Sequence, residues 1–106
     1  MIEAKKIEDL MLELLESHID IEEWKITDRG REIIDQISDH AEQTRIFQEN
    51  KDRGAIFDGL TAEKVFVHML DRIVKAPTSI HRDMSVLLIM PFVRQKLREE
   101  ANHGQS

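Results

Sequence analysis

Met84-Ser-Val-Leu-Leu-Ile-Met-Pro-Phe-Val93 is the stretch of this sequence that decides the fold, because every residue in it except Ser85 is apolar or proline. At about 100° per residue, its apolar side chains fall on both sides of a helix. A helix that is apolar on both sides must be buried on both sides. A membrane span needs about 20 apolar residues, and Asp83 and Arg94 bracket this shorter stretch closely. The stretch therefore predicts the central helix of a soluble all-α protein.

The composition favours the same fold class in one domain, residues 1–106. The chain has four Gly, two Pro, no Tyr and no Cys, and it is rich in residues with high helix propensity. Its length allows one core but leaves little room for a deep active site and a supporting shell. The lack of cysteine excludes a disulfide framework and a thiolate zinc site. The N-terminus lacks the basic-then-apolar order of a signal peptide, so we expect a cytoplasmic protein.

Apolar spacing and capping residues predict a compact bundle of four main helices. Thr27 or Asp28 is a helix cap, Gly54 ends a helix, and Thr61 caps the next one. Pro91 predicts a kink in the central C-terminal helix, because proline removes a hydrogen bond and crowds the preceding turn. The predicted helices cover about residues 3–18, 28–52, 61–75 and 79–101, and residues 102–106 form a frayed tail.

The segment between the first two helices has two interpretations. Asp20 and Glu23 have the spacing of a capping box, in which each residue satisfies a backbone N–H at a helix start. The four apolar residues of this segment belong either to a short helical turn or to an extended connector anchored in the core. The capping box favours the helical turn.

The run Trp24-Lys-Ile-Thr-Asp-Arg-Gly-Arg-Glu-Ile-Ile34 resembles the segment after the wing in winged-helix regulators of the PadR or MarR type. There, an aromatic strand leads through Thr-x-x-Gly into a final helix. The resemblance covers about a tenth of the chain, and only 23 residues precede Trp24. That is too few for a helix-turn-helix and a wing, so the favoured interpretation is a Thr-capped helix with a glycine in its first turn.

The charge is distributed unevenly along the chain. The net charge is -6, with 15 acidic and 8 basic residues in positions 1–53 but 6 acidic and 7 basic residues in positions 54–106. Helical spacing collects the acids of the first half into two stripes, which serve solubility or dock a basic protein partner. The residues of this candidate partner-binding face are Asp9, Glu13, Glu16, Asp28, Glu32, Asp35, Asp39 and Glu42.

Some apolar residues exceed what one layer of neighbouring helices would cover. They lie on the first helix and on the second side of the C-terminal helix, and we expect them to meet a second copy of the chain. The predicted homodimer interface comprises Leu12, Val86, Met90, Val93 and Leu97.

No motif predicts an active site, a cofactor or a metal. Glu100-Ala-Asn-His103 has the Glu-x-x-His spacing of di-iron bundles, but such a site needs two copies and further inward glutamates. His81-Arg82-Asp83 matches three letters of the kinase catalytic loop without the rest of that machinery. The leading hypothesis is a non-enzymatic regulator or adaptor that binds another protein.

Two further functions remain open. One is a dimeric DNA-binding regulator, although no basic concentration matches what phosphate neutralisation needs; its candidate residues are Arg29, Arg31, Arg45, Lys51 and Arg53. The other is a helical-bundle enzyme or ligand carrier, for which polar groups must converge on a pocket in the core. No core stripe carries a carboxylate or a histidine pair, so this hypothesis ranks last.

Overall fold

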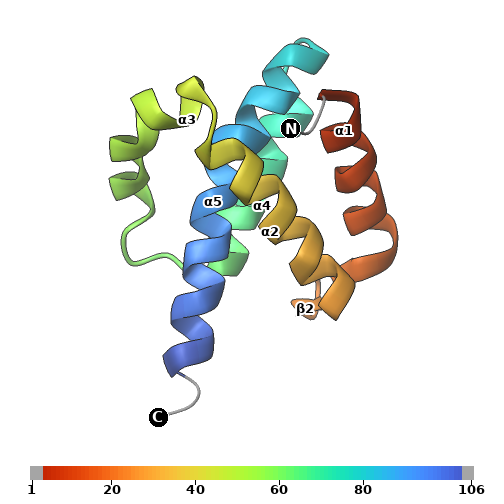
Figure 1. Cartoon of the computed structure of the whole chain (residues 1–106). Helices are drawn as coiled ribbons and strands as arrows, with labels where there is room; N and C mark the ends of the chain where they lie inside the picture. The colour runs from red at the N-terminus through yellow and green to blue at the C-terminus, as the bar shows by residue number, and fades with distance from the viewer. Residues whose placement is uncertain (1–3, 104–106) are drawn as a thin grey trace.

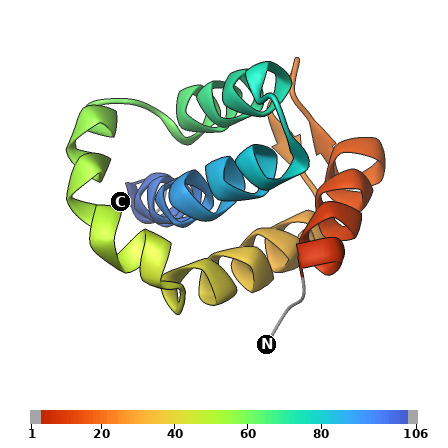
Figure 2. The same cartoon turned by 90° about the horizontal axis from the view of Figure 1, so that it is seen from above.

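The last helix of the described chain lies at the centre of the fold. A computed structural model describes residues 4–103, which form five α-helices, a π-helical turn, a 3-10 segment and a two-stranded hairpin. Helix α5 (Ser79–His103) packs against α4 (Ala62–Lys75) on one side and α2 (Asp28–Glu42) on the other. Figure 2 shows α1 (Ala4–Glu13) and the segment after α2 closing the two ends around it. The predicted all-α fold is confirmed.

The apolar stretch of α5 is buried on both sides, as its sequence predicts. Val86 and Ile89 are almost fully buried, and Met90 and Val93 have no exposed surface. They join one core with residues of α1, α2 and α4 (Figure 1). Burial of each large apolar side chain contributes roughly 1.5–3 kcal/mol, so α5 supplies a large share of the energy that holds the other helices.

The segment after α1 forms a hairpin, and the predicted helical turn is wrong. Helix α1 passes into the π-helical turn η1 (Leu14–His18), and β1 (Ile19–Asp20) then pairs antiparallel with β2 (Lys25–Ile26). The carboxylate of Asp20 accepts a hydrogen bond from the Glu23 N–H at 3.2 Å, so the capping pattern closes the hairpin loop. Trp24 ends the loop with a φ of 54°, and its ring packs on Phe66 with 5.8 Å between centroids.

The predicted second helix is divided into three parts, so the count of four main helices is corrected. Helix α2 begins after Thr27 and ends at Glu42, and Thr44 caps the short helix α3 (Arg45–Asn50) by accepting from the Phe47 N–H. The 3-10 segment η2 (Lys51–Phe57) follows. The break redirects the chain so that Phe47 reaches Phe92 of α5, with 5.5 Å between ring centroids. If α2 continued as a straight helix beyond Glu42, it would have no apolar stripe in this region to pack against the core.

The two C-terminal helices follow their predictions closely. Thr61 caps α4 by accepting from the Lys64 N–H at 3.2 Å. Helix α5 is continuous through Pro91 and includes Asn102 and His103, which were expected to belong to the frayed tail; residues 104–106 lie outside the described part. The kink at Pro91 stays a prediction.

Candidate functional site

Three of the predicted acidic residues bind an arginine of the same chain. Arg94 of α5 is only 7 % exposed, and its guanidinium donates to the carboxylates of Asp39 and Glu42 and lies 4.0 Å from that of Asp35. Burial disfavours its charge, but the two hydrogen-bonded carboxylates outweigh burial and raise the pKa of Arg94. This part of the predicted partner-binding face therefore joins α2 to α5.

Glu13 also binds an arginine of the same chain, at the start of α2. Arg29 of α2 donates to both of its oxygens, at 2.9 and 3.2 Å, and the His18 ring lies 3.1 Å away. The hydrogen bond from Arg29 is the main cause of a lowered pKa of Glu13. Arg29 also lies 3.9 Å from Glu32. These contacts tie α1 to the start of α2.

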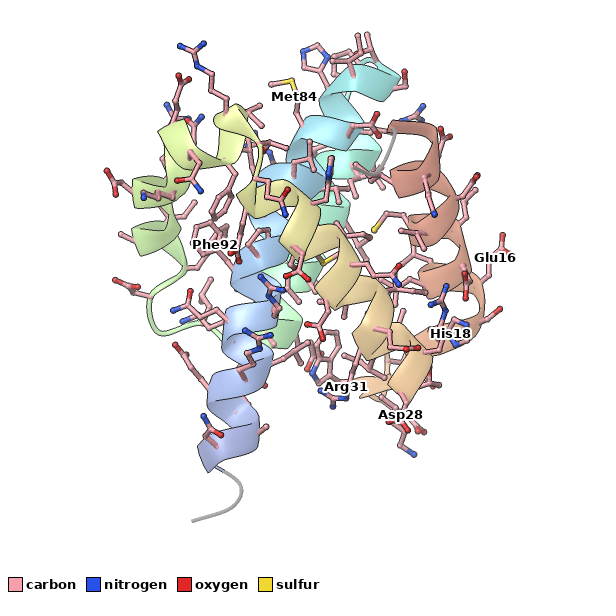
Figure 3. The ribbon with its side chains drawn as sticks, viewed as in Figure 1. Glu16, His18, Asp28, Arg31, Met84 and Phe92 are labelled. Carbon is pink, nitrogen blue, oxygen red and sulfur yellow. The ribbon has the colours of Figure 1, made fainter. Side chains whose placement is uncertain are left out.

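The remaining predicted acids are exposed but dispersed. Asp9, Glu16 and Asp28 make no ion pair within residues 6–102. Figure 3 shows Glu16 on the outer side of the turn after α1 and Asp28 at the base of α2. The eight residues thus divide into internal ion pairs and separate exposed positions.

The structure places most residues of the predicted dimer interface in the core of the single chain. Val86, Met90 and Val93 are 3 %, 0 % and 0 % exposed within the single chain, and Leu97 packs partly against the same core. These side chains cover the neighbouring helices of their own chain because α5 is surrounded by them. Leu12 alone of the five is well exposed, at 50 %.

Leu12 belongs to a hollow between α1 and the start of α5, which we call the α1–α5 groove. Leu15, 36 % exposed, lies three residues further along, in the turn η1 that continues α1. The groove has a volume of about 190 Å³ and is mainly apolar. Its lining residues are Ile7, Glu8, Met11, Leu12, Leu15, Ile73, Ser79, Arg82, Asp83 and Val86.

Two carboxylates face this groove from different helices. Burial is the main cause of a raised pKa of Asp83, and the negative charge of Glu8 acts in the same direction, whereas Arg82 opposes both. Like charges that approach at a partly buried site destabilise each other. A cation placed between Glu8 and Asp83 would remove that repulsion.

The sequence hypothesis identified Leu12 and Val86 but missed the other residues of the groove. In the sequence, Asp83 is notable only as a charged residue beside the apolar stretch and as part of the kinase-like triplet. The periodicity of α1 offers one signal, since Glu8, Leu12 and Leu15 have the spacing of one helical face. No local pattern in the sequence of α5 indicates that its residues line the groove.

The basic residues of the DNA-binding hypothesis do not form one free surface. Arg29 is bound to Glu13, and Arg45 lies 2.6 Å from Glu49. Arg53 instead lines a separate hollow beside η2. Arg31 lies at the lower end of α2 in Figure 3.

The groups that resembled catalytic motifs have structural partners. Glu100 accepts a hydrogen bond from the Ala62 N–H at 2.8 Å, which satisfies a free donor at the start of α4. His81 lies 2.7 Å from the Thr78 hydroxyl. Residues 6–102 contain no group of three or more His, Asp or Glu side chains placed to hold a metal. None of the helices in the described part has the length and apolarity to cross a membrane.

Comparison of the chain with protein-family models, curated proteins and solved structures found no match.

Proposed function

We propose that this protein is a non-enzymatic binding module that accepts a basic, amphipathic helix of a partner protein in the α1–α5 groove. The observation that carries the proposal is the exposure of Leu12 and Leu15 beside an apolar hollow with carboxylates at its edge. An apolar helix face laid into such a groove is a common mode of peptide recognition.

The chemistry of the groove favours a basic partner over a second copy of the chain. Glu8 and Asp83 face the hollow together, and the chain carries a net charge of -6. A second copy brings the same acidic edge, whereas a Lys or Arg one turn from an apolar anchor neutralises it. Asp9 and Glu16 flank the apolar residues on α1 and add to the attraction at long range.

A designed peptide pair tests this proposal without knowledge of the natural partner. The first is an amphipathic helical peptide of Leu and Lys, and the second replaces every Lys with Glu. We expect the Leu/Lys peptide to shift the backbone amide signals of Leu12, Leu15 and Asp83 in heteronuclear NMR, and the Leu/Glu peptide to leave them unchanged. Binding should weaken as salt rises, because the contribution of the carboxylates is screened.

Two substitutions of exposed apolar residues distinguish peptide binding in the groove from non-specific binding to exposed apolar side chains. Leu12→Ser should weaken the Leu/Lys peptide about tenfold, since it removes a central apolar anchor. Val67→Ser is the matched control, because Val67 is 45 % exposed on α4 and lies outside the groove. Equal losses for both variants, or peptide shifts confined to other helices, would contradict the proposal.

Light scattering tests whether the occupant is a second copy of the chain. A dimer that is abolished by Leu12→Ser and unchanged by Val67→Ser would assign the groove to self-association and support the predicted homodimer. A mass independent of concentration leaves the groove available for the basic helix.

A further inference from the structure

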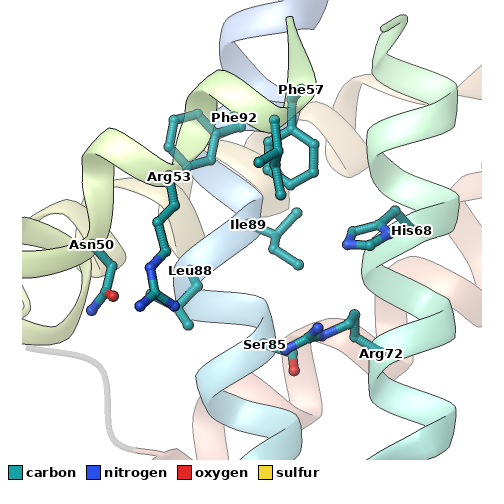
Figure 4. A pocket seen from close by; sticks show the side chains of 10 residues that line it. Asn50, Arg53, Phe57, His68, Arg72, Ser85, Leu88, Ile89 and Phe92 are labelled. Atoms are coloured by element: carbon teal, nitrogen blue, oxygen red, sulfur yellow. The ribbon is translucent and has the colours of Figure 1, made fainter.

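A second hollow lies on the opposite side of α5, between η2 and α4. It has a volume of about 140 Å³. Its apolar lining residues are Ile56, Phe57, Leu88, Ile89 and Phe92. In Figure 4, Arg53 extends from η2 along one side, and Arg72 extends from α4 toward Ser85 on the other. We call this hollow the arginine cavity.

The two arginines differ from Arg29 and Arg94 in their charge partners. Arg29 and Arg94 are neutralised by carboxylates of the same chain. Within residues 6–102, Arg53 and Arg72 make neither an ion pair nor a side-chain hydrogen bond, and no Asp or Glu lines the arginine cavity. Two cations beside apolar walls create a positive potential that an anion can satisfy.

The other polar groups of the cavity limit what the anion can be. The Ser85 hydroxyl donates to the His81 carbonyl at 3.0 Å, so it has only acceptor capacity left. The side-chain amide of Asn50 donates to the Ile46 carbonyl at 2.8 Å. His68 packs its ring against Phe57, with 5.6 Å between centroids. The guanidinium groups of Arg53 and Arg72 are therefore the charged donors of the cavity. The apolar walls beside them favour a carboxylate with an apolar body over an inorganic phosphate.

We propose that the arginine cavity binds a small carboxylate whose remaining body is apolar and flat or slender. Arginine forms paired, charge-assisted hydrogen bonds with carboxylates. The apolar body would lie against Ile89, Phe57 and Phe92. An apolar protein cavity of about 150 Å³ accommodates benzene, so a molecule the size of benzoate matches the arginine cavity, with its carboxylate at the open side.

Benzoate itself is the first probe, with benzyl alcohol and benzylamine as neutral and cationic controls of similar shape. Titration followed by heteronuclear NMR should shift the amide signals of Leu88, Ile89 and Arg72 most strongly with benzoate. We expect benzyl alcohol to bind at least about fivefold more weakly, because it cannot use the two guanidinium groups. Hexanoate serves as a second carboxylate probe with a slender body.

Single substitutions identify the groups that hold the carboxylate. Arg53→Gln and Arg72→Gln should each weaken benzoate binding about five- to tenfold and leave the weak binding of benzyl alcohol unchanged. Both side chains are exposed, so the variants should fold normally. Lys64→Gln is the control for the loss of one positive charge, since this exposed α4 residue lies outside the cavity, and it should bind benzoate like the wild type.

Two outcomes would overturn this inference. One is the absence of shifts at Leu88 and Ile89 with both benzoate and hexanoate at millimolar concentration. The other is benzyl alcohol binding as tightly as benzoate, which would define an apolar hollow without anion recognition. The result is independent of the α1–α5 groove, because Leu12→Ser should leave benzoate binding intact and Arg72→Gln should leave peptide binding intact.

Discussion

Arg94 shows how far the role of a residue can depart from its position in the sequence. Basic residues near the end of a helix are expected from the helix dipole, and Glu99 and Glu100 follow closely. In the folded chain, Arg94 instead pairs with carboxylates more than 50 residues away in sequence. No local sequence pattern predicts that pairing, because it depends on the packing of α5 against α2.

Replacement of Arg94 should leave the carboxylates around it to repel one another. Arg94→Met keeps much of the apolar stem but leaves Asp39 and Glu42 without their hydrogen-bonded cation, close to Asp35. We expect a loss of about 2 kcal/mol in the free energy of unfolding, because two charge-assisted hydrogen bonds disappear while their exposed acceptors regain water. Urea unfolding at low and high salt measures the loss, which should shrink at high salt.

Arg98→Met provides the matched comparison for this prediction. Arg98 lies one turn further along α5, is 67 % exposed and approaches Asp35 only to 3.8 Å. Its loss should cost no more than about 0.5 kcal/mol. Similar losses for the two variants would mean that the ion pairs of Arg94 contribute little.

Gly54 occupies a position that no larger residue fits. A Cβ atom there would lie 2.2 Å from the Phe92 ring, and Phe92 also packs against Phe57 with 5.6 Å between centroids. Gly54→Ala should therefore destabilise the fold by roughly 1–3 kcal/mol through overpacking, measured by thermal unfolding. Gly59→Ala, where φ is +81° but the space is open, should cost only about 1 kcal/mol through backbone strain.

At the scale of elements, threonine caps explain both the correct and the incorrect helix boundaries. Thr27 and Thr61 precede clear apolar periodicity, so the starts of α2 and α4 were predictable. Thr44 lies inside what resembles one long helix, and its cap becomes evident only because Phe47 turns toward α5. The hairpin was missed because β1 and β2 have two residues each, too few for strand alternation to show.

Thr27 should be the most sensitive of these caps. Its hydroxyl accepts from the Gly30 N–H at 3.0 Å and also lies 3.0 Å from the His18 ring. A Cβ at position 30 would lie 2.8 Å from the His18 carbonyl oxygen, so α2 and the turn after α1 are in close contact. Thr27→Ala should cost about 2 kcal/mol, the upper part of the range for a cap, and should speed amide exchange in the hairpin.

Thr61→Ala is the control, because Thr61 caps α4 through its hydrogen bond from Lys64 alone. We expect a loss of about 1 kcal/mol with no change in hairpin exchange. Faster exchange throughout the chain in both variants would indicate that neither cap acts locally.

At the scale of the whole molecule, composition and one apolar stretch were enough to predict the all-α class and the central helix. They were not enough for the α1–α5 groove or the arginine cavity. Each hollow is built by residues from three separate segments of the chain, and no segment by itself indicates which of its residues share a surface with the other two. Only the packing determines which exposed residues share a surface.

Two carboxyl groups with shifted pKa values should make the stability of the molecule depend on pH in opposite directions. Glu13 has a lowered pKa, so its stabilisation is present above its ordinary value near 4.5 and is lost as pH falls through the lowered value. Asp83 has a raised pKa, so stability falls as pH rises through that value and the partly buried carboxyl ionises. Chemical unfolding across the acidic and neutral pH range should show both the loss of stability at low pH and the decline as pH rises.

Single variants show which residue causes each of the two changes of stability with pH. Asp83→Asn should stabilise the protein at neutral pH, by on the order of 0.5 kcal/mol, and remove the decline on the neutral side. Glu13→Gln should weaken the protein at neutral pH and reduce the loss on the acidic side. A pH profile that neither variant changes would place the titrating groups elsewhere.

The central position of α5 has a consequence for how the chain is made. Every earlier α-helix packs against α5, yet α5 follows them all in the sequence. During synthesis on the ribosome, the nascent helices lack their shared partner until residues 79–103 leave the exit tunnel. Their apolar faces stay exposed for that interval, and a chaperone has its best opportunity to bind them before the core closes.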